Sequence, residues 1–591
     1  MLSTKRGVLS TKRGLFFLAF QIAVLSACQK KTAGPPPRFA VLRIENLTGN
    51  PALDWAGRGV SESLSRMLDG ALSGVVVGTP ALTRVNATLG KRPLGAPGVS
   101  SERAGAMGAS ANHAITGYLE SAGAGLRLVL ADEDISLQTT PRLISVSGRT
   151  VLDVVAAAAR ALAEKPHPAP TTSEEALRFW VQGFEKGGPE EVAQYQLAVA
   201  RDPDFGPAWV SLVNATAQVD RTAAIGLVEK ALMRVLPPLD RAALEVERAD
   251  LNGNRASRLQ ALRAYSALSP GDVLLLRNVA EQESFSGNFA AAAADYRKTV
   301  AILPADVASL NQAGYNFAWA GNYDEAVRAL KEYALLRPSE ANPVDSLGDV
   351  NYWFGRYKEA AANYAAAHAK DPQMLSGGNL YKAAWAQFRS GDTKSADVLF
   401  NQFLKSQEAS QNSAISVVHG DWLYRSGRPK EALELLRKAS DAAREPAAKA
   451  MLSSEMAILQ LAEGDRAAAL RSLQNAGPLN IPSILTVRFS LLPSAPADEW
   501  ESRSQRLFAQ PQLSALRAVA LGWALILDGR KDAAVSVWEK IVEDSPAIDF
   551  FPRAVLARLK GEKLKHLAPP DPRTLNQFEA VLDRLETFTS K

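Results

Sequence analysis

A repeat of 34 residues is the feature of this 591-residue chain that most constrains its fold. Glycines recur at this interval, and a proline follows each glycine after 17 residues. The glycines are Gly253, Gly287, Gly321 and Gly355, and the prolines are Pro270, Pro304, Pro338 and Pro372. Glycine permits the positive φ of a tight turn, and proline closes a helix. The pattern predicts helical pairs that stack, because one pair cannot bury its apolar side alone.

The residues around these turns resemble the tetratricopeptide repeat, which has the same period. An alanine lies five residues after the turn glycine, at a crowded contact between helices, and an aromatic residue lies two after it. The alanines are Ala292, Ala326 and Ala360, and the aromatics are Phe289, Tyr323 and Tyr357. The resemblance implies a mainly α fold, a TPR-type α-solenoid that binds other proteins.

The solenoid is expected over residues 171–546, where the period gives about eleven helical pairs. Beyond Gly355 the spacing of the turn glycines loosens to 36 and 37 residues, while the alanines keep their offset. The proline-rich segment 479–512 matches the pattern least. Residues 547–591 are expected to form a polar C-terminal capping segment, which such arrays need for solubility.

The resemblance also implies where a partner binds. In related solenoids the concave face is lined by positions two, five, nine and twelve of the first helix of each pair. The same frame in this chain gives a candidate partner groove, with Glu281 on the same stripe. The groove residues are Arg277, Asn311, Tyr315, Asp345, Asp349, Tyr352, Tyr381, Trp385, Phe388, Asp421 and Tyr424. Aromatics and acids suit an extended peptide or a partner helix. The alternative is that these aromatics are partly buried between repeats.

The N-terminus has the form of an export signal. Lys5, Arg6, Lys12 and Arg13 precede an apolar run over 15–27 that only Gln21 interrupts. This arrangement is typical of a secretory signal. The run is too short for a membrane-spanning helix, which needs about 20 apolar residues.

The end of this run, Leu25-Ser26-Ala27-Cys28, resembles the lipobox of bacterial lipoproteins. The resemblance implies that Cys28 is lipidated and becomes the mature N-terminus, with 1–28 as the signal peptide and 29–37 as a tether. Gln29 after the cysteine points to the outer membrane, with the protein facing the periplasm. The alternative is an ordinary buried cysteine behind an uncleaved anchor.

Residues 38–150 alternate β-favouring and helical patterns, which predicts a small α/β domain before the solenoid. Strands are expected at 39–45, 75–77, 113–120, 126–131 and 142–148, and helices at 53–72 and 100–110. The stretch 39–64, with Ile115-Thr-Gly-Tyr-Leu-Glu120, resembles the TolB-like amino-terminal domain, although Glu45 replaces the commoner Phe. The resemblance implies a non-catalytic envelope domain that contacts proteins. Residues 151–171 are expected to form a linker.

Charge and cysteine content exclude several functions. Removing the four basic residues of the signal from 67 leaves 63 against 62 acidic residues, so a nucleic-acid partner is not predicted. Because Cys28 is the one cysteine, an intrachain disulfide and a cysteine-based zinc site are excluded. No cofactor and no metal are predicted.

No catalytic motif is present, so the chain is not expected to be an enzyme. The five histidines are dispersed, and His113 is expected to be a core or edge residue. Gly57-Arg58-Gly59 is expected to be a helix-opening turn and not a phosphate-binding loop. The acids at 132–134 are expected in a solvated turn.

The leading hypothesis is an envelope lipoprotein that binds protein partners through the solenoid groove. One alternative is a regulatory TPR protein of the cyclase- or kinase-associated TolB-like type that lacks its effector domain. Another is a protein that contacts cell-wall glycan through groove aromatics.

Overall fold

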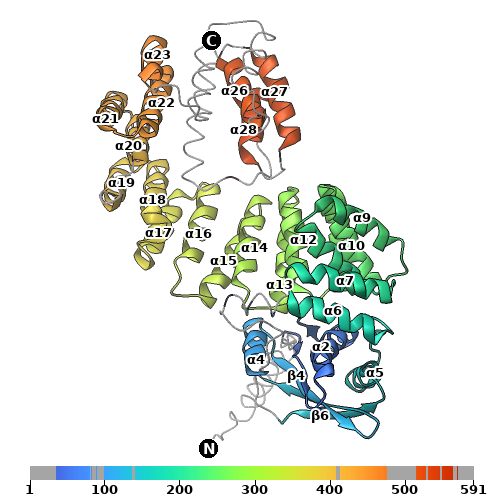
Figure 1. Cartoon of the computed structure of the whole chain (residues 1–591). Helices are drawn as coiled ribbons and strands as arrows, with labels where there is room; N and C mark the ends of the chain where they lie inside the picture. The colour runs from blue at the N-terminus through green and yellow to red at the C-terminus, as the bar shows by residue number, and fades with distance from the viewer. Residues whose placement is uncertain are drawn as a thin grey trace, which may run out of the picture. The chain divides into compact units, whose positions relative to one another are not determined.

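The computed structural model describes residues 35–79, 82, 85, 88, 99–135, 140–407, 413–475, 514–527, 530–545, 549–562 and 569. The signal peptide, Cys28, most of the tether and the segment 479–512 lie outside these residues. The chain forms two compact units (Figure 1). The first contains residues 1–275 and 301–304, and the second contains 276–300 and 305–591.

The first unit begins with a mixed β-sheet in the order β3-β1-β4-β5-β6, and β2 also pairs with β4. Strand β1 is parallel to β3 and β4, whereas β4, β5 and β6 form antiparallel ladders. The strands are β1 (Arg38–Val41), β2 (Glu45–Asn46), β3 (Val75–Val76), β4 (His113–Ala122), β5 (Gly125–Asp134) and β6 (Arg142–Gly148). The helices of this part are α2 (Asp54–Leu68), α4 (Val99–Gly108) and α5 (Val151–Leu162), after a short 3-10 turn η1 (Pro51–Leu53). The predicted small α/β region is therefore present.

Apolar side chains of α2, α5 and the sheet make the core of this part. Val60 and Leu64 of α2 pack with Val154 of α5, and all three are fully buried. Ile115 and Leu128 from the paired strands complete the same cluster. Along β5 the buried residues Leu128 and Leu130 alternate with less buried ones, as the two-residue period of a strand requires.

Two expectations for this region are wrong. Gly57-Arg58-Gly59 lies inside α2 and does not open it. Gly57 is needed there because a Cβ would overlap the carbonyl oxygen of Ile44. The acids Asp132 and Asp134 lie on β5 and not in a turn, because the ladder with β4 extends to the pair His113–Asp134. Pairing with β4 therefore determines the structure of this segment, although its polar composition favours a turn.

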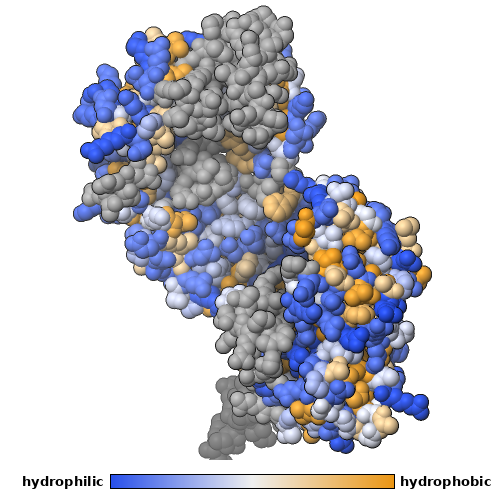
Figure 2. Space-filling view, viewed as in Figure 1, coloured by the Kyte–Doolittle hydropathy of each residue, from blue (hydrophilic) through white to orange (hydrophobic). Residues whose placement is uncertain are grey.

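Helical pairs follow in the first unit. The helices are α6 (Glu174–Lys186), α7 (Pro189–Arg201), α8 (Gly206–Ala217), α9 (Arg221–Leu232), α10 (Pro238–Leu251) and α11 (Arg255–Leu268). Trp180, Phe205 and Trp209 are buried between them. On the visible side of this unit, orange apolar residues are interspersed with blue polar ones (Figure 2).

Further helical pairs follow, and apart from residues 273–275 and 301–302 they belong to the second unit. They are α12 (Val273–Phe285), α13 (Phe289–Ile302), α14 (Val307–Trp319), α15 (Tyr323–Leu336), α16 (Asn342–Trp353), α17 (Tyr357–Lys370), η2 (Met374–Gly377), α18 (Gly378–Arg389), α19 (Thr393–Gln407), α20 (Ser413–Arg425), α21 (Pro429–Ala442), α22 (Pro446–Ala462) and α23 (Arg466–Asn475). Three more helices, α26 (Ser514–Leu527), α27 (Lys531–Asp544) and α28 (Phe550–Lys560), pack on one another around Trp538.

The turns of these pairs use the predicted residues. The glycines at 253, 287, 321, 355, 391, 427 and 464 all have positive φ, between 67° and 90°. An Asn or Asp directly after several of them caps the next helix; for example, Asn254 accepts from the backbone N–H of Ser257 at 3.0 Å. The alanines five residues after the glycine, including Ala326, Ala360 and Ala396, are fully buried. The predicted fold class, an α-solenoid after a small α/β region, is confirmed.

Candidate functional site: the inner helices of the repeats

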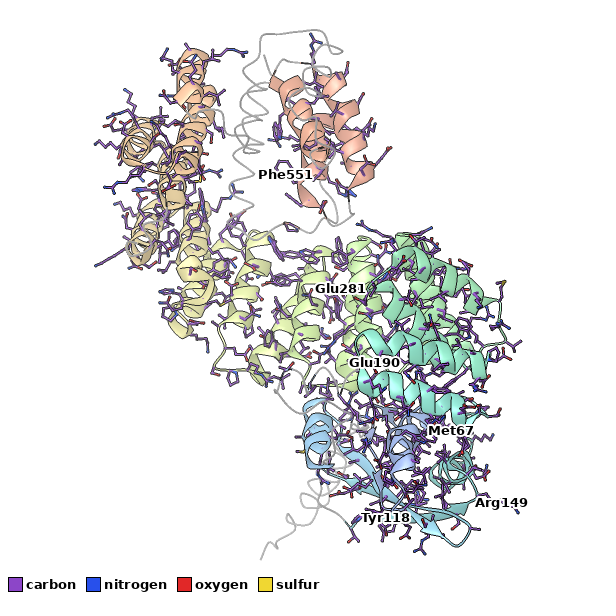
Figure 3. The ribbon with its side chains drawn as sticks, viewed as in Figure 1. Met67, Tyr118, Arg149, Glu190, Glu281 and Phe551 are labelled. Carbon is purple, nitrogen blue, oxygen red and sulfur yellow. The ribbon has the colours of Figure 1, made fainter. Side chains whose placement is uncertain are left out.

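All eleven predicted groove residues lie in the second unit, on the first helices of successive pairs, α12, α14, α16, α18 and α20. They recur because each first helix presents the same positions to the same side at each step of the array. Side chains of this unit are drawn in Figure 3, where the exposed Glu281 is labelled.

Two of the predicted acids belong to a buried ion cluster. The Nζ atom of Lys382 on α18 lies 2.8 Å from Oδ2 of Asp345 and 2.6 Å from Oδ1 of Asp349, both on α16. The lysine side chain is 1% exposed and each aspartate side chain 6%. The pKa of Lys382 is raised: burial alone would lower it, but the carboxylates of Asp349 and Asp345 outweigh burial. Lys382 is therefore a charged internal partner of both acids.

Two phenols and an amide complete this cluster. Tyr364 of α17 donates to Oδ1 of Asp349 at 2.8 Å, and Tyr315 of α14 donates to Oδ2 of the same residue at 3.0 Å. Asn379 donates to Asp345 at 2.6 Å. Burial raises the pKa of both tyrosines well above 10, and the charge of Asp349 acts in the same direction. The phenols thus remain donors, and the cluster ties α14, α16, α17 and α18 together.

The acids of the expected groove are consequently held by the protein itself. Asp345 and Asp349 are 5% exposed, and Lys382 occupies the place that a cationic partner would take. Arg277 is likewise paired, with its Nε 2.9 Å from Oδ2 of Asp306. Lys382 was not among the predicted residues, although a single charge within the apolar run 380–386 was a signal of a buried ion.

Three of the predicted aromatics are buried between repeats. For these residues the alternative of burial therefore holds, and not that of an exposed groove. Tyr352, Tyr381 and Trp385 are 3%, 4% and 2% exposed. Tyr381 stacks on Phe403 with ring centroids 5.2 Å apart, and Trp385 packs edge-on against Trp422 at 4.9 Å. Large rings at these positions reach the second helix or the next pair, because adjacent helices lie only about 8–10 Å apart.

The other predicted residues keep part of their surface. Asn311, Tyr315, Phe388 and Tyr424 are partly exposed, and the Tyr424 hydroxyl donates to Glu463 at 2.8 Å. The carbonyl oxygen of the Asn311 side chain has no hydrogen-bond partner among the described residues. Asp421 is 7% exposed and bonds Arg425 at 3.0 Å.

Two tryptophans on the same helices were not predicted. Trp319 and Trp353 are partly exposed and lie 6.2 Å apart between ring centroids. Tyr315 stacks on Trp319 at 5.8 Å and contacts Trp353 at 5.5 Å. The two tryptophans are 34 residues apart, which is one period of the repeat. Each follows directly after the twelfth position of the frame that gave the predicted groove residues. That spacing was the signal that could have found them.

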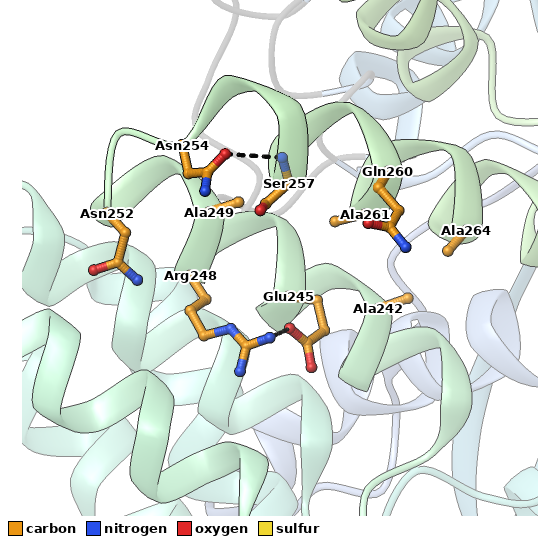
Figure 4. A pocket seen from close by; sticks show the side chains of 10 residues that line it. All are labelled: Ala242, Glu245, Arg248, Ala249, Asn252, Asn254, Ser257, Gln260, Ala261 and Ala264. Atoms are coloured by element: carbon orange, nitrogen blue, oxygen red, sulfur yellow. Dashed lines mark hydrogen bonds and ion pairs between the residues drawn. The ribbon is translucent and has the colours of Figure 1, made fainter.

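The first unit contains a separate open pocket between α10 and α11 (Figure 4). Its volume is about 420 Å³. Alanines form part of its lining, and Glu245 and Arg248 form an ion pair at its edge. Within the described ranges, no group of three or more His, Cys, Asp or Glu is arranged to hold a metal. None of the helices described has the length and hydropathy to cross a bilayer.

Comparisons with known proteins agree with the repeat. Residues 379–408, which cover α18 and α19, match the tetratricopeptide repeat family. A comparison with curated proteins gave no match.

Similar solved structures include the MamA protein, at 16% identity over 29% of this chain and 92% of that chain, with a TM-score of 0.26. YrrB, described as a TPR protein with an unusual peptide-binding site, is 14% identical over 31% of this chain and 94% of that chain, with a TM-score of 0.27. A tetratricopeptide repeat protein from Parabacteroides merdae ATCC 43184 is 14% identical over 42% of this chain and 97% of that chain, with a TM-score of 0.30. TM-scores below 0.5 assign no function. The chain contains a tetratricopeptide repeat, set within a series of helical pairs that share its turns and packing alanines.

Proposed function

We propose that this protein is a non-catalytic, lipid-anchored scaffold of the bacterial envelope that binds a protein partner along the first helices of its repeats. The observation that carries the binding proposal is the set of partly exposed groups on these helices. Asn311 and Phe388 stand on α14 and α18, and Trp319 and Trp353 add aromatic surface. Partly exposed aromatic and amide side chains are common anchors for a bound peptide.

The burial of Asp345 and Asp349 with Lys382 refines the kind of partner. With these acids neutralised internally, the face offers aromatic surface and amide groups and not an acidic stripe. We therefore expect binding that depends weakly on salt, because few exposed charges of the face would be screened.

Crosslinking pull-down from cells tests the binding proposal. Asn311→Ala and Phe388→Ala are expected to lose a partner that the wild type recovers. The matched control is Leu335→Ala on α15, whose side chain is 81% exposed on the second helix of a pair. Equal recovery by all four proteins would refute the assignment of the partner to this face.

The sequence Leu25-Ser26-Ala27-Cys28 supports the anchor. A fatty-acid probe supplied to growing cells is expected to label the wild type and not Cys28→Ala. A wild-type chain that carries no label and stays in the cytoplasm would contradict the export proposal, while leaving the binding proposal intact.

A further inference from the structure

Two buried polar atoms at equivalent positions of successive repeats have no hydrogen-bond partner among the described residues. They are Nε1 of Trp385 on α18 and Oδ2 of Asp421 on α20. Each residue lies six before the turn glycine of its pair, Gly391 or Gly427. The side chains are more than nine-tenths buried, with 2% of Trp385 and 7% of Asp421 exposed. A buried polar atom without a partner is destabilising, so two of them on the first helices of successive pairs point to a ligand.

The side chain of Arg425 contacts both of these residues. Its Nε donates to the other carboxylate oxygen of Asp421, Oδ1, at 3.0 Å. Its guanidinium also lies over the Trp385 ring, 5.3 Å from the centroid. The arginine side chain therefore lies against both residues, over the face of the indole ring.

The adjacent tryptophan provides an internal comparison. Trp422, next to Asp421 in the chain, packs against Trp385, and its Nε1 donates to Oδ1 of Asp397 at 2.8 Å. One of these two packed indoles therefore has its N–H bonded within the protein, and the other, among the described residues, does not.

The donor and acceptor types select the ligand. An indole N–H can only donate, and an ionised carboxylate can only accept. A carboxylate ligand would be repelled by Asp421, and an ammonium ligand would leave the indole without an acceptor. A peptide group supplies a C=O for Trp385 and an N–H for Asp421.

We propose that Trp385 and Asp421 bind the main-chain amides of an extended partner peptide, which enters when the Arg425 side chain moves off the indole ring. This inference rests on the proposed peptide- or protein-binding function. It makes recognition at α18 and α20 dependent on the backbone of the partner and largely independent of its side chains.

The experiment observes the indole N–H directly. The full-length chain, kept in detergent and labelled with ¹⁵N at its tryptophan indoles, is titrated with a pentaalanine peptide that is acetylated at its N-terminus and amidated at its C-terminus. The resonance of Trp385 is identified by its absence in Trp385→Phe. It is expected to move downfield as a new hydrogen bond forms, while the resonance of Trp422 stays in place.

Two changes separate the donor from the acceptor. Methylation of every backbone nitrogen of the peptide removes the N–H that Asp421 would accept. Asp421→Asn keeps the shape of the side chain but places an NH2 group opposite the peptide N–H. Each change is expected to weaken binding about ten-fold, the effect of one lost hydrogen bond. Because the methylated peptide is tested on the wild type, this part does not depend on how a variant folds.

No movement of the Trp385 resonance at any peptide concentration would overturn the inference, as would equal binding of the methylated and unmethylated peptides. Either result, combined with a partner lost from Asn311→Ala and Phe388→Ala in the pull-down, would refute this inference alone. If the Trp385 resonance does not move and Asn311→Ala and Phe388→Ala still recover the partner, the proposed function is refuted as well.

Discussion

Replacement of Lys382 by methionine is expected to loosen the helices around it more than any surface substitution. Methionine preserves most of the length of the side chain but leaves Asp345 and Asp349 buried without their cation. In the wild type both carboxylates lie within 2.8 Å of the ammonium and are 6% exposed at the side chain. Removal of one partner from a buried ion pair costs about 3–5 kcal/mol, because the remaining charge is uncompensated.

Hydrogen exchange followed by mass spectrometry measures this loss of stability separately for each helix. Since about 1.4 kcal/mol is a factor of ten in an equilibrium constant, amides of α16 and α18 in Lys382→Met should exchange about two to three and a half orders of magnitude faster. A global melting temperature is less informative, because a chain with two compact units need not unfold in one step. The matched control is Lys358→Met on α17, whose lysine is exposed.

A rescue variant identifies the cause. Lys382→Met combined with Asp345→Asn and Asp349→Asn removes the uncompensated charges and should recover most of the protection. Equal exchange in Lys382→Met and Lys358→Met would refute the reasoning. The sign of the pH effect follows from the raised pKa of Lys382: its contribution is complete below pH 10.5, the ordinary value, and is lost as the pH rises through the raised pKa.

Three further outcomes are expected. Gly348→Ala would overlap the Tyr364 ring and should destabilise α16 by about 1–3 kcal/mol, measured as faster hydrogen exchange; an unchanged rate would contradict it. Gly226→Ala is the opposite case, because a Cβ there meets nothing within 4 Å, and α9 should gain about 1 kcal/mol of protection. Burial raises the pKa of Glu62 above 4.5, although the charge of Arg58 acts to lower it. The native state therefore holds a proton on Glu62 at pH values where the unfolded state has lost it. Stability consequently falls as the pH rises from 4.5 through the raised pKa. Glu62→Gln should abolish that fall, measured as the protection of α2 amides from hydrogen exchange, and parallel pH profiles of both proteins would show the reasoning to be wrong.

The repeat itself could be predicted from the sequence because its signals are local. A turn glycine needs positive φ whatever surrounds it, as Gly321 shows with φ of 83°. Ala326, five residues later, must be small because two helices cross there, and it is fully buried. Such constraints act within one helical pair, so a 34-residue window contains all of the information.

The strands of the first unit were predictable for a similar reason, but the end of β5 was not. Alternation along 126–131 marks a strand with one buried face. Asp132 and Asp134 extend that strand although their composition favours a turn, because β4 supplies ladder partners for them. Pairing energy comes from a strand that the local sequence does not contain.

Only the tertiary structure decided what the candidate groove presents. The helical frame placed Asp349 and Trp385 on the first helices of their pairs, but it did not say what meets them there. Lys382, 33 residues after Asp349, neutralises that acid from the next pair, and Trp422, 37 residues after Trp385, covers that ring. Contacts between repeats depend on how neighbouring pairs stack, so the charge and exposure of the binding face follow from packing and not from periodicity.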